Sequence, residues 1–378
     1  MTEINIISFN VPFPANYGGV IDVFYRLKYF HNKGIKVHLH CFEYGRGEQP
    51  ELEKYCETVQ YYKRKKGILA HFSKLPFIVK SRVSAALKTN LLKNDFPILF
   101  EGLHCCYLLN DAAFKNRFKI VRNHNIEHNY YNELAIIEQK PLTKKYFKTE
   151  AKKLAHFEPI LENADLSISI SETDFAYFKK KYPTTHSITA PGFHSNSKVS
   201  IAPGKGAYIL YHGNLSVPEN SNAVEFIIEN LFKNAKIPLK IAGLNPSKDL
   251  INLIKKHENI ELIKNPNDRN MNELIKNAQI NLLYTEQATG IKLKLLNVLY
   301  NGRHCIVNPK MVAGTSLGRI CLIGKNTTEL KELINSTFNL EMTQEEIETR
   351  KTLLQNDYAN ETSFNKIIEA MKKQQNAS

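Results

Sequence analysis

The sequence predicts an α/β fold in which two doubly wound, Rossmann-like domains, each with a parallel sheet, face each other across a cleft. Three observations support this prediction. Short apolar segments alternate with longer helical patterns along almost the whole chain, as expected for parallel strands joined by crossover helices. A stretch rich in Gly, Pro, Ser and Lys at 190–206 interrupts the alternation once. With 378 residues, the chain is also too long for one ordinary core.

Residues 1–190 are expected to form the first domain. INIISF at 4–9 and KVHLHCF at 36–42 have the composition of buried strands, and the pattern between them is that of a helix over 20–34. That helix ends at a glycine, the residue that most often terminates a helix. Further strands are expected at 97–102, 119–124 and 166–171, and a long helix at 145–164.

Residues 191–350 are expected to form the second domain, because the strand–helix alternation restarts after the linker. The expected strands are 207–213, 238–243, 260–264, 280–284, 304–308 and 321–324, and the expected helices are 219–233, 247–257, 270–277 and 289–300. The remainder is mostly helical. Residues 351–378 are interpreted as a C-terminal helix, a candidate to pack back on the first domain.

Cysteine usage and the N-terminal sequence indicate a cytoplasmic protein. The six cysteines form no CxxC pair and lie mostly in apolar runs, which favours buried, reduced thiols over metal ligands or disulfides. MTEINIISFN leads directly into a strand pattern, without the features of a signal peptide. No apolar run approaches the roughly 18 residues that a membrane-spanning helix needs.

The formal net charge is +14, and its excess is concentrated in residues 61–93. Eight basic residues there precede Lys93, with Ile, Leu and Phe side chains between them. Basic and apolar residues in mixture suit an anionic membrane surface. A solvated charged face is the simpler alternative, and nucleic acid is a third one that no recognised binding motif accompanies. The basic residues are Lys63, Arg64, Lys65, Lys66, Lys74, Lys80, Arg82, Lys88 and Lys93.

Three loops after predicted strands of the first domain carry candidate site residues. Gly18 and Gly19 follow the first strand, where glycine lets backbone N–H groups approach a phosphate. Polar titratable groups lie at or just after the carboxyl ends of the strands at 97–102 and 119–124, which is where α/β enzymes position substrates. They are Glu101, His104, Arg122, His124, Glu127 and His128. Metal binding by His124, Glu127 and His128, or an ordinary loop with hydrogen-bonded histidines, are the alternatives.

Two segments of the second domain have the features of an anion site. Gly213 and Asn214 end a strand just before a helix that begins near Glu219, and a helix N-terminus favours anions. The segment QATGIKLKLLNVLYNGRHCIVNP at 287–309 places Lys292 and Lys294 after Gly290, ahead of an apolar helix. Residues two apart on a helix point about 200° away from each other, so both lysines cannot be buried. Two solvated lysines would be the ordinary alternative.

Taken together, these motifs resemble the GT-B glycosyltransferases of family 4, the retaining, nucleotide-sugar-dependent group common in bacterial polysaccharide assembly. The resemblance covers almost the entire chain. It is carried by PFPANYGG (12–19), RNHNIEH (122–128), SISISETD (167–174), YHGNLSVPEN (211–220), KIAGLNP (240–246) and TGIKLKLLNVLYNGRHCIVNP (289–309). The resemblance implies sugar transfer with retention, without a metal ion or a cofactor, from a UDP- or GDP-sugar.

The resemblance also implies roles for individual residues. His124 would lie near the transferred sugar, and Lys292 would stabilise the leaving diphosphate; these are the catalytic candidates. The donor-binding candidates are Gly18, Gly19, Gly213, Asn214, Thr289, Gly290, Ile291, Lys292, Lys294 and Asn297. The acceptor-binding candidates are Arg122, Glu127, His104 and Glu101.

Two departures from the family pattern concern the donor. Thr289 and Asn297 stand where many members have two glutamates, and Asn214 with Glu219 or Asn220 replaces the usual Arg and Lys after the glycine. Lys292, being closest to Gly290, is the favoured substitute for that phosphate clamp.

The expected function is therefore transfer of a sugar to a lipid-diphosphate or glycan acceptor, by an enzyme peripherally associated with the inner membrane face. The alternatives are a nucleotide-sugar epimerase or hydrolase on the same fold, and a catalytically inactive partner subunit. A nucleic-acid partner is not expected.

Overall fold

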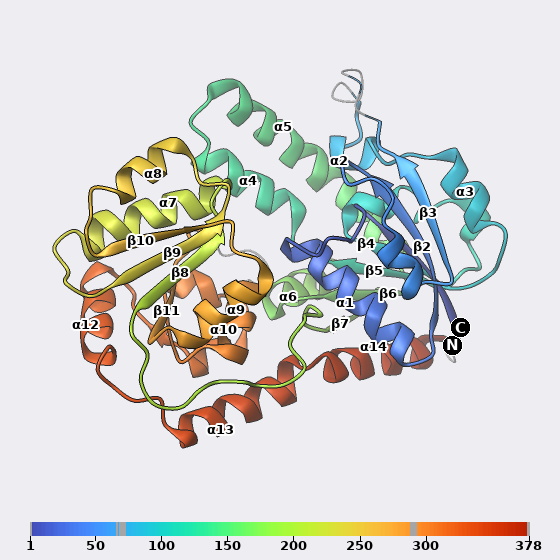
Figure 1. Cartoon of the computed structure of the whole chain (residues 1–378). Helices are drawn as coiled ribbons and strands as arrows, with labels where there is room; N and C mark the ends of the chain where they lie inside the picture. Colours follow the sequence, from blue (N-terminus) through green and yellow to red (C-terminus); the bar gives the residue numbers. More distant parts are fainter. Residues whose placement is uncertain (1, 66, 68–72, 288–292, 376–378) are drawn as a thin grey trace. The chain divides into compact units, whose positions relative to one another are not determined.

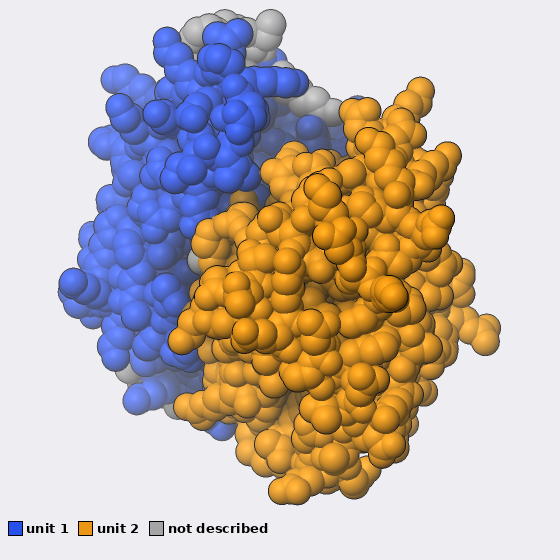
Figure 2. Space-filling view, turned by 90° about the vertical axis from the view of Figure 1, so that its left-hand side faces the viewer, with its two compact units in different colours: residues 1–195, 358–378 blue, residues 196–357 orange. Residues whose placement is uncertain are grey.

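The computed structural model of the chain describes residues 2–65, 67, 73–287 and 293–375. The chain forms two compact units, coloured separately in Figure 2: unit 1 consists of Met1–Ser195 with Tyr358–Ser378, and unit 2 of Asn196–Asp357. The first boundary thus follows residue 195, where the sequence suggested 190. The chain returns to unit 1 at residue 358, where the sequence suggested 351.

Unit 1 contains a seven-stranded parallel sheet in the order β3-β2-β1-β4-β5-β6-β7. Its strands are β1 (Glu3–Ser8), β2 (Lys36–Glu43), β3 (Thr58–Lys63), β4 (Ile98–Glu101), β5 (Lys119–Asn123), β6 (Leu166–Ser169) and β7 (His186–Thr189). Its α-helices are α1 (Gly18–Asn32), α2 (Phe77–Lys80), α3 (Ala85–Leu91), α4 (Glu127–Ile137), α5 (Pro141–Phe157), α6 (Glu172–Lys181) and α14 (Asn360–Gln375). The parallel, doubly wound arrangement that the sequence predicted is confirmed.

The order of strands changes direction at β1, whose Ile6 pairs with Leu39 of β2 on one side and Leu99 of β4 on the other. The central strands β1 and β4 are covered on both faces, and their apolar side chains alternate between two buried clusters. Ile6 packs with α1 and α14 on one face, and Ile7 packs with the opposite layer. Loops at the carboxyl ends of β1 and β4 diverge at this reversal, which is where doubly wound sheets bind ligands.

The sequence did not predict β3, β7 and α4. In β3 alternate residues are exposed, and only Tyr62 is fully buried; such an edge strand lacks the apolar run that marks a central one. The four residues of β7 are half-buried. Helix α4 occupies most of the segment that the sequence left as a loop, because its apolar side packs mainly on α5.

The C-terminal helix α14 belongs to unit 1 and lies beside α1 (Figure 1). The ring of Phe364 packs edge-on against Phe30 and obliquely against Tyr29, at centroid distances of 5.6 and 5.3 Å. Ile367 and Met371 continue the same buried cluster. The final helix therefore completes one apolar face of the first sheet.

Unit 2 contains a six-stranded parallel sheet in the order β10-β9-β8-β11-β12-β13. Its strands are β8 (Ile209–Asn214), β9 (Leu239–Leu244), β10 (Ile260–Lys264), β11 (Ile280–Leu283), β12 (His304–Val307) and β13 (Leu322–Ile323). Its α-helices are α7 (Pro218–Ile227), α8 (Lys248–Ile254), α9 (Asp268–Asn277), α10 (Leu293–Asn301), α11 (Pro309–Val312), α12 (Thr327–Thr337) and α13 (Gln344–Leu353). The direction of winding reverses between β8 and β11.

The basic stretch 61–93 is only partly a surface. Ile78 and Val79 are core residues, and Arg82 is buried with its guanidinium on the carbonyl oxygens of Phe9 and Ile78. Arg64 is half-buried, and its guanidinium lies over the Tyr44 ring. The expectation that this stretch as a whole meets a membrane is therefore wrong for Ile78, Val79 and Arg82. The residues 66 and 68–72 lie outside the described part of the chain.

Candidate functional site

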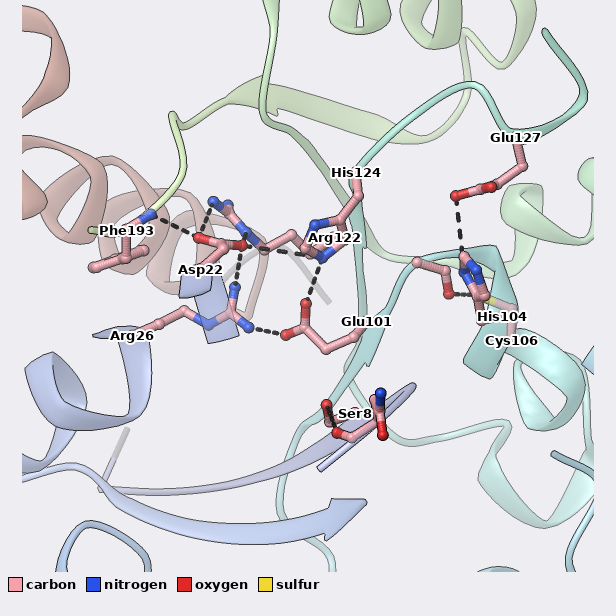
Figure 3. A network of polar contacts seen from close by, with 12 residues as sticks. Ser8, Asp22, Arg26, Glu101, His104, Cys106, Arg122, His124, Glu127 and Phe193 are labelled. Carbon is pink, nitrogen blue, oxygen red and sulfur yellow. Dashed lines mark hydrogen bonds and ion pairs between the residues drawn. The ribbon is translucent and has the colours of Figure 1, made fainter. Parts of the chain in front are cut away.

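The carboxyl edge of the unit 1 sheet holds a network of charged side chains that α1, β4 and β5 bring together (Figure 3). The Arg122 guanidinium donates from Nε and Nη2 to the two carboxylate oxygens of Asp22, at 2.6 and 3.0 Å. Arg26, one turn after Asp22 on α1, donates to Glu101. The backbone N–H of Phe193 donates to Asp22 at 2.7 Å. This network joins the helix to two strand ends and to the last segment before the unit boundary.

The charges in this network compensate one another away from water. Asp22, Arg26, Glu101 and Arg122 are all buried. Burial alone would raise the pKa of Asp22, but the charges of Arg122 and Arg26 hold it well below its ordinary range. Burial lowers the pKa of Arg26 to about 9. Buried charges are tolerated when they are paired and hydrogen-bonded; here the charges are paired, but Nε and Nη1 of Arg26 and Nη1 of Arg122 have no hydrogen-bond partner among the described residues. Glu101 and Arg122 were predicted to bind the acceptor substrate. Their charged groups instead form ion pairs with Arg26 and Asp22.

His124 is placed at the centre of this edge, directly after β5. Its Nε2 lies 2.9 Å from Oε2 of Glu101, and the Phe9 ring packs edge-on against it at 5.5 Å. Burial lowers the pKa of His124 to about 4, so the imidazole is neutral at pH 7. A neutral imidazole bonded to Glu101 through one nitrogen has its other nitrogen to offer a substrate.

His104 and Glu127 form a second, less satisfied pair beside His124. Nδ1 of His104 lies 3.8 Å from Oε1 of Glu127, and both of these buried atoms lack a hydrogen-bond partner among the described residues. Burial raises the pKa of Glu127 to about 8 and lowers that of His104 well below its ordinary value. Unpaired buried polar atoms are costly, and a polar ligand would remove that cost. Each of these two predicted site residues therefore has one polar atom that could form a hydrogen bond with a ligand.

The two glycines predicted in the first loop lie in the first turn of α1 and have different surroundings. A Cβ on Gly19 would lie 2.6 Å from Cζ of Phe9, whereas a Cβ on Gly18 would meet nothing within 4 Å. Phe9 packs against both His104 and His124. Gly19 is thus required for the position of the Phe9 ring, and Gly18 is not.

Three of these side chains, Asp22, Glu101 and His124, also bring potential metal ligands within 4.8 Å of one another. Their carboxylate oxygens, however, already accept hydrogen bonds from Arg26 and Arg122. The two guanidinium groups supply the positive charge that a cation would bring, so the donor set does not fit a divalent metal ion.

Unit 2 presents a corresponding site at the carboxyl ends of β8 and β11. β8 ends in Gly213 and Asn214, and α7 begins four residues later. Nζ of Lys294, from α10, donates to Oδ1 of Asn220 at 3.0 Å, and Nδ2 of Asn220 donates to the Asn214 carbonyl at 3.0 Å. A Cβ on Gly213 would lie 2.9 Å from Cγ of Asn220. Glycine at 213 therefore lets the first turn of α7 approach the strand end.

Other polar residues of this site could not be singled out from the sequence. The Thr285 hydroxyl donates to Glu219, and its backbone N–H donates to Oδ1 of Asn308 at 3.2 Å. His212 is buried, its Nε2 has no hydrogen-bond partner in the described structure, and burial with the nearby charge of Lys294 lowers its pKa to about 3. The only signal in the sequence was that His212, Thr285 and Asn308 lie at or just after a predicted strand end, and that Glu219 begins a predicted helix.

The structure describes only part of the predicted lysine segment. Thr289, Gly290, Ile291 and Lys292 lie outside the described residues. From Leu293 onwards the chain forms α10, within the predicted helix at 289–300, with Leu295, Leu296, Val298 and Leu299 buried. Asn297 is half-buried on this helix, and its amide group contacts Asn272 and Asn301.

Comparison with known proteins identifies the architecture. No family model matches the chain. Sucrose-phosphate synthase from Thermosynechococcus elongatus is similar with a TM-score of 0.69 and 13% identity, over 100% of both chains. A structure of Anabaena HepE in complex with UDP and glucose has a TM-score of 0.68 and 10% identity over 99% of this chain and 100% of that chain. The structure of TarM has a TM-score of 0.68 and 12% identity, over 98% of this chain and 99% of that chain.

These neighbours are GT-B glycosyltransferases. The chain has the GT-B fold. Its two parallel sheets are those of the two GT-B domains, which confirms the predicted fold class. In sequence, the chain is 24% identical to an uncharacterized 44.6 kDa protein in the cps region of Klebsiella pneumoniae, over 97% of this chain and 99% of that protein. Within the GT-B fold described here, none of the helices is long and apolar enough to cross a membrane.

Proposed function

We propose that this protein is a glycosyltransferase that uses a nucleotide-sugar donor. The observation that carries the proposal is the arrangement at the winding reversal of unit 2. There Asn220, in the first turn of α7, links the end of β8 at Gly213 and Asn214 to the ammonium group of Lys294. A strand–helix turn with glycine and a nearby cation suits a diphosphate, which accepts backbone hydrogen bonds and carries negative charge.

In this proposal the diphosphate of the donor binds unit 2 at Gly213, Asn214 and Lys294. Lys292 adds a second cation, and both lysines stabilise the charge that develops on the leaving diphosphate. Stabilisation of developing charge is usually the largest contribution to catalysis. Asn297 reaches a ribose hydroxyl. No metal ion and no cofactor besides the donor is required, because the lysines carry the charge compensation.

Unit 1 supplies the groups that handle the transferred sugar and the acceptor. Neutral His124 donates its Nε2–H to Glu101 and accepts a hydrogen bond from a sugar hydroxyl at Nδ1, and His104 and Glu127 bind the acceptor hydroxyl through their unpaired atoms. Glu101 and Arg122 act as positioning residues, because they hold His124 and α1 in place. We further propose transfer with retention of the anomeric configuration.

The acceptor is proposed to be a carrier-linked sugar, such as a lipid diphosphate, or a glycan, in the assembly of a bacterial surface polysaccharide. The similarity to a protein encoded in a cps region supports this context. Such an acceptor would place the enzyme in the cytoplasm, at the inner face of the membrane.

A thermal-shift panel of UDP-, GDP- and CMP-linked sugars tests the donor site. We expect one nucleotide class to raise the midpoint of unfolding of the wild-type protein and to have no effect on Lys292→Ala. Lys256→Ala, an exposed lysine elsewhere on unit 2, is the matched control and should respond like the wild type. With the selected donor, turnover by Lys292→Ala within threefold of the wild type would exclude the proposed role of Lys292.

A non-catalytic partner subunit is the second candidate, favoured by Thr289 and Asn297 at positions where the resembling family has glutamates. A chain of that kind would bind none of the donors in the panel.

A further inference from the structure

We propose that the tip of the α4–α5 hairpin docks on an anionic phospholipid surface. The docking surface consists of Ile136, Lys140, Leu142, Lys144, Lys145 and Lys148. This surface is distinct from the basic stretch at 61–93, part of which the structure places in the core. It requires neither the donor site nor catalytic activity.

The first observation is the exposure of two large apolar side chains at one end of this hairpin. Ile136 lies in the last turn of α4 and is 73% exposed, and Leu142 lies in the first turn of α5 and is 85% exposed. These are the highest values among the large apolar residues that are described as exposed. The three residues 138–140 separate the two helices, so both side chains belong to the same tip.

The second observation is the charge around these side chains. Four lysines lie in or next to the first two turns of α5: Lys140, Lys144, Lys145 and Lys148. None of their ammonium groups forms an ion pair with an acid in the described part of the chain. The one acid of α5, Glu150, is buried and bonded to the backbone of Phe77 and to Lys153. Glu138, in the connection between the helices, accepts a hydrogen bond from the backbone N–H of Lys140, so the tip carries four lysines against one acid and an excess of positive charge.

The third observation is that the side chains on the inner side of the hairpin already pack against other residues of unit 1. Tyr131 of α4 packs edge-on against Phe147 of α5 at 5.9 Å, and Ala151 and Leu154 are buried. Leu142, Lys145 and Lys152 are spaced at three and seven residues, so they share the outer side of α5. Lys144 of the docking surface is half-buried, whereas its other five residues are exposed and are not needed for packing within unit 1.

This chemistry favours a lipid surface over a protein partner. The core of a protein–protein interface is depleted in lysine, whereas lysine is attracted by the negative potential of anionic lipids and reaches the headgroups with its long side chain. Two apolar side chains flanked by four lysines can enter the boundary between headgroups and acyl chains. A second copy of this chain would instead bring like charges together.

Vesicle sedimentation of the full-length protein tests the proposal. The probes are vesicles of phosphatidylcholine alone and of phosphatidylcholine mixed with phosphatidylglycerol. We expect binding to the mixed vesicles only, weakened by salt. Ile136→Asp/Leu142→Asp and Lys140→Gln/Lys145→Gln/Lys148→Gln should each reduce the vesicle partition coefficient at least about tenfold. The thermal unfolding midpoint of each variant confirms that it is folded.

Leu92→Asp is the matched control, because Leu92 is also apolar and 52% exposed but lies in the 61–93 stretch. It should bind vesicles like the wild type. Absence of wild-type binding, or unchanged binding of both hairpin variants, would overturn the proposal. Loss of binding in Leu92→Asp alone would place the surface at 61–93 instead. A hairpin variant that changes the oligomeric state, with no vesicle binding by the wild type, would identify a second copy as the occupant.

Discussion

Among single residues, Glu127 has the environment that most directly affects stability. Its carboxyl group is buried next to His104, and burial raises its pKa to about 8 from an ordinary value of 4.5. Between these two pH values the folded chain keeps a proton that the unfolded chain has released. The free energy of unfolding must therefore fall as pH rises through this window.

Glu127→Gln removes that titration. We expect the variant to be more stable than the wild type by about 2–4 kcal/mol at pH 8.5 or above, and the difference to shrink towards about pH 5. Urea unfolding of both proteins across this range measures it. Glu172→Gln, an exposed neighbour at the start of α6, should show no such trend. Parallel stability curves for Glu127→Gln and the wild type would show that Glu127 is ionised throughout.

Lys294 is the described cation of the proposed donor site. Its ammonium group is bonded to Asn220 beside the end of β8. A charge-assisted hydrogen bond is worth about 1.5–3 kcal/mol, so Lys294→Ala should weaken binding of the nucleoside diphosphate by about 10- to 150-fold. Isothermal titration with the nucleotide that the thermal-shift panel selects checks this. An affinity equal to that of Lys256→Ala would remove Lys294 from the site.

The sequence could group some site residues but not others, for a physical reason. Four of the site residues lie at or just after the end of a strand that the sequence reveals, so it was predictable that they would meet at one edge of the sheet. They are Glu101, His104, Arg122 and His124. Asp22 and Arg26 lie on α1. From the sequence, polar residues of such a helix are expected on its solvent-facing side. Only the order of strands, which brings α1 over β4 and β5, reveals that they are buried partners of Arg122 and Glu101.

At the scale of elements, Gly19 in the first turn of α1 packs closely against the ring of Phe9 in the loop after β1, and this contact holds the loop in place. Gly19→Ala would push a methyl group into Phe9, the ring between His104 and His124. We expect a loss of about 1–3 kcal/mol in the free energy of unfolding, as for other overpacked sites, together with loss of transferase activity.

Gly18→Ala provides the comparison for that variant. The added methyl group meets nothing, and alanine is favoured over glycine in a helix, so stability should stay equal or rise by about 0.5–1 kcal/mol. Chemical unfolding and turnover of both variants are the measurements. Equal effects of the two substitutions would show that the loop adjusts freely around Phe9.

How well each element could be predicted depended on how fully it is buried. The central strands are covered on both faces, which produces apolar runs that sequence alone reveals. By contrast, β3 alternates between exposed and partly buried residues, and α4 is packed mainly on α5. Neither carries a periodic pattern strong enough to distinguish it from a loop.

At the scale of the whole molecule, the two units are not two consecutive segments of the chain. Unit 1 contains α14, although unit 2 lies between this helix and the rest of unit 1 in the sequence. Phe364 anchors α14 against Phe30 and Tyr29. Removal of a buried phenylalanine costs about 3–5 kcal/mol, so Phe364→Ala should destabilise unit 1 by that amount.

Hydrogen exchange of individual amides can measure this effect in each unit. We expect faster exchange in β1, β2 and α1 of Phe364→Ala, with unit 2 unchanged. Lys366→Ala, on the exposed side of α14, should match the wild type. Equal acceleration in both units would mean that they unfold together.

The place of α14 in the sequence also determines the order in which the protein can mature during translation. A ribosome releases the strands of unit 1 before unit 2, but α14, which packs in the same cluster as Phe30 and Phe193, emerges only after unit 2. Unit 2 is one continuous segment, so all of its residues have emerged before α14. The half of the protein that is synthesised first is therefore completed only after unit 2, and its apolar face stays uncovered until α14 has emerged.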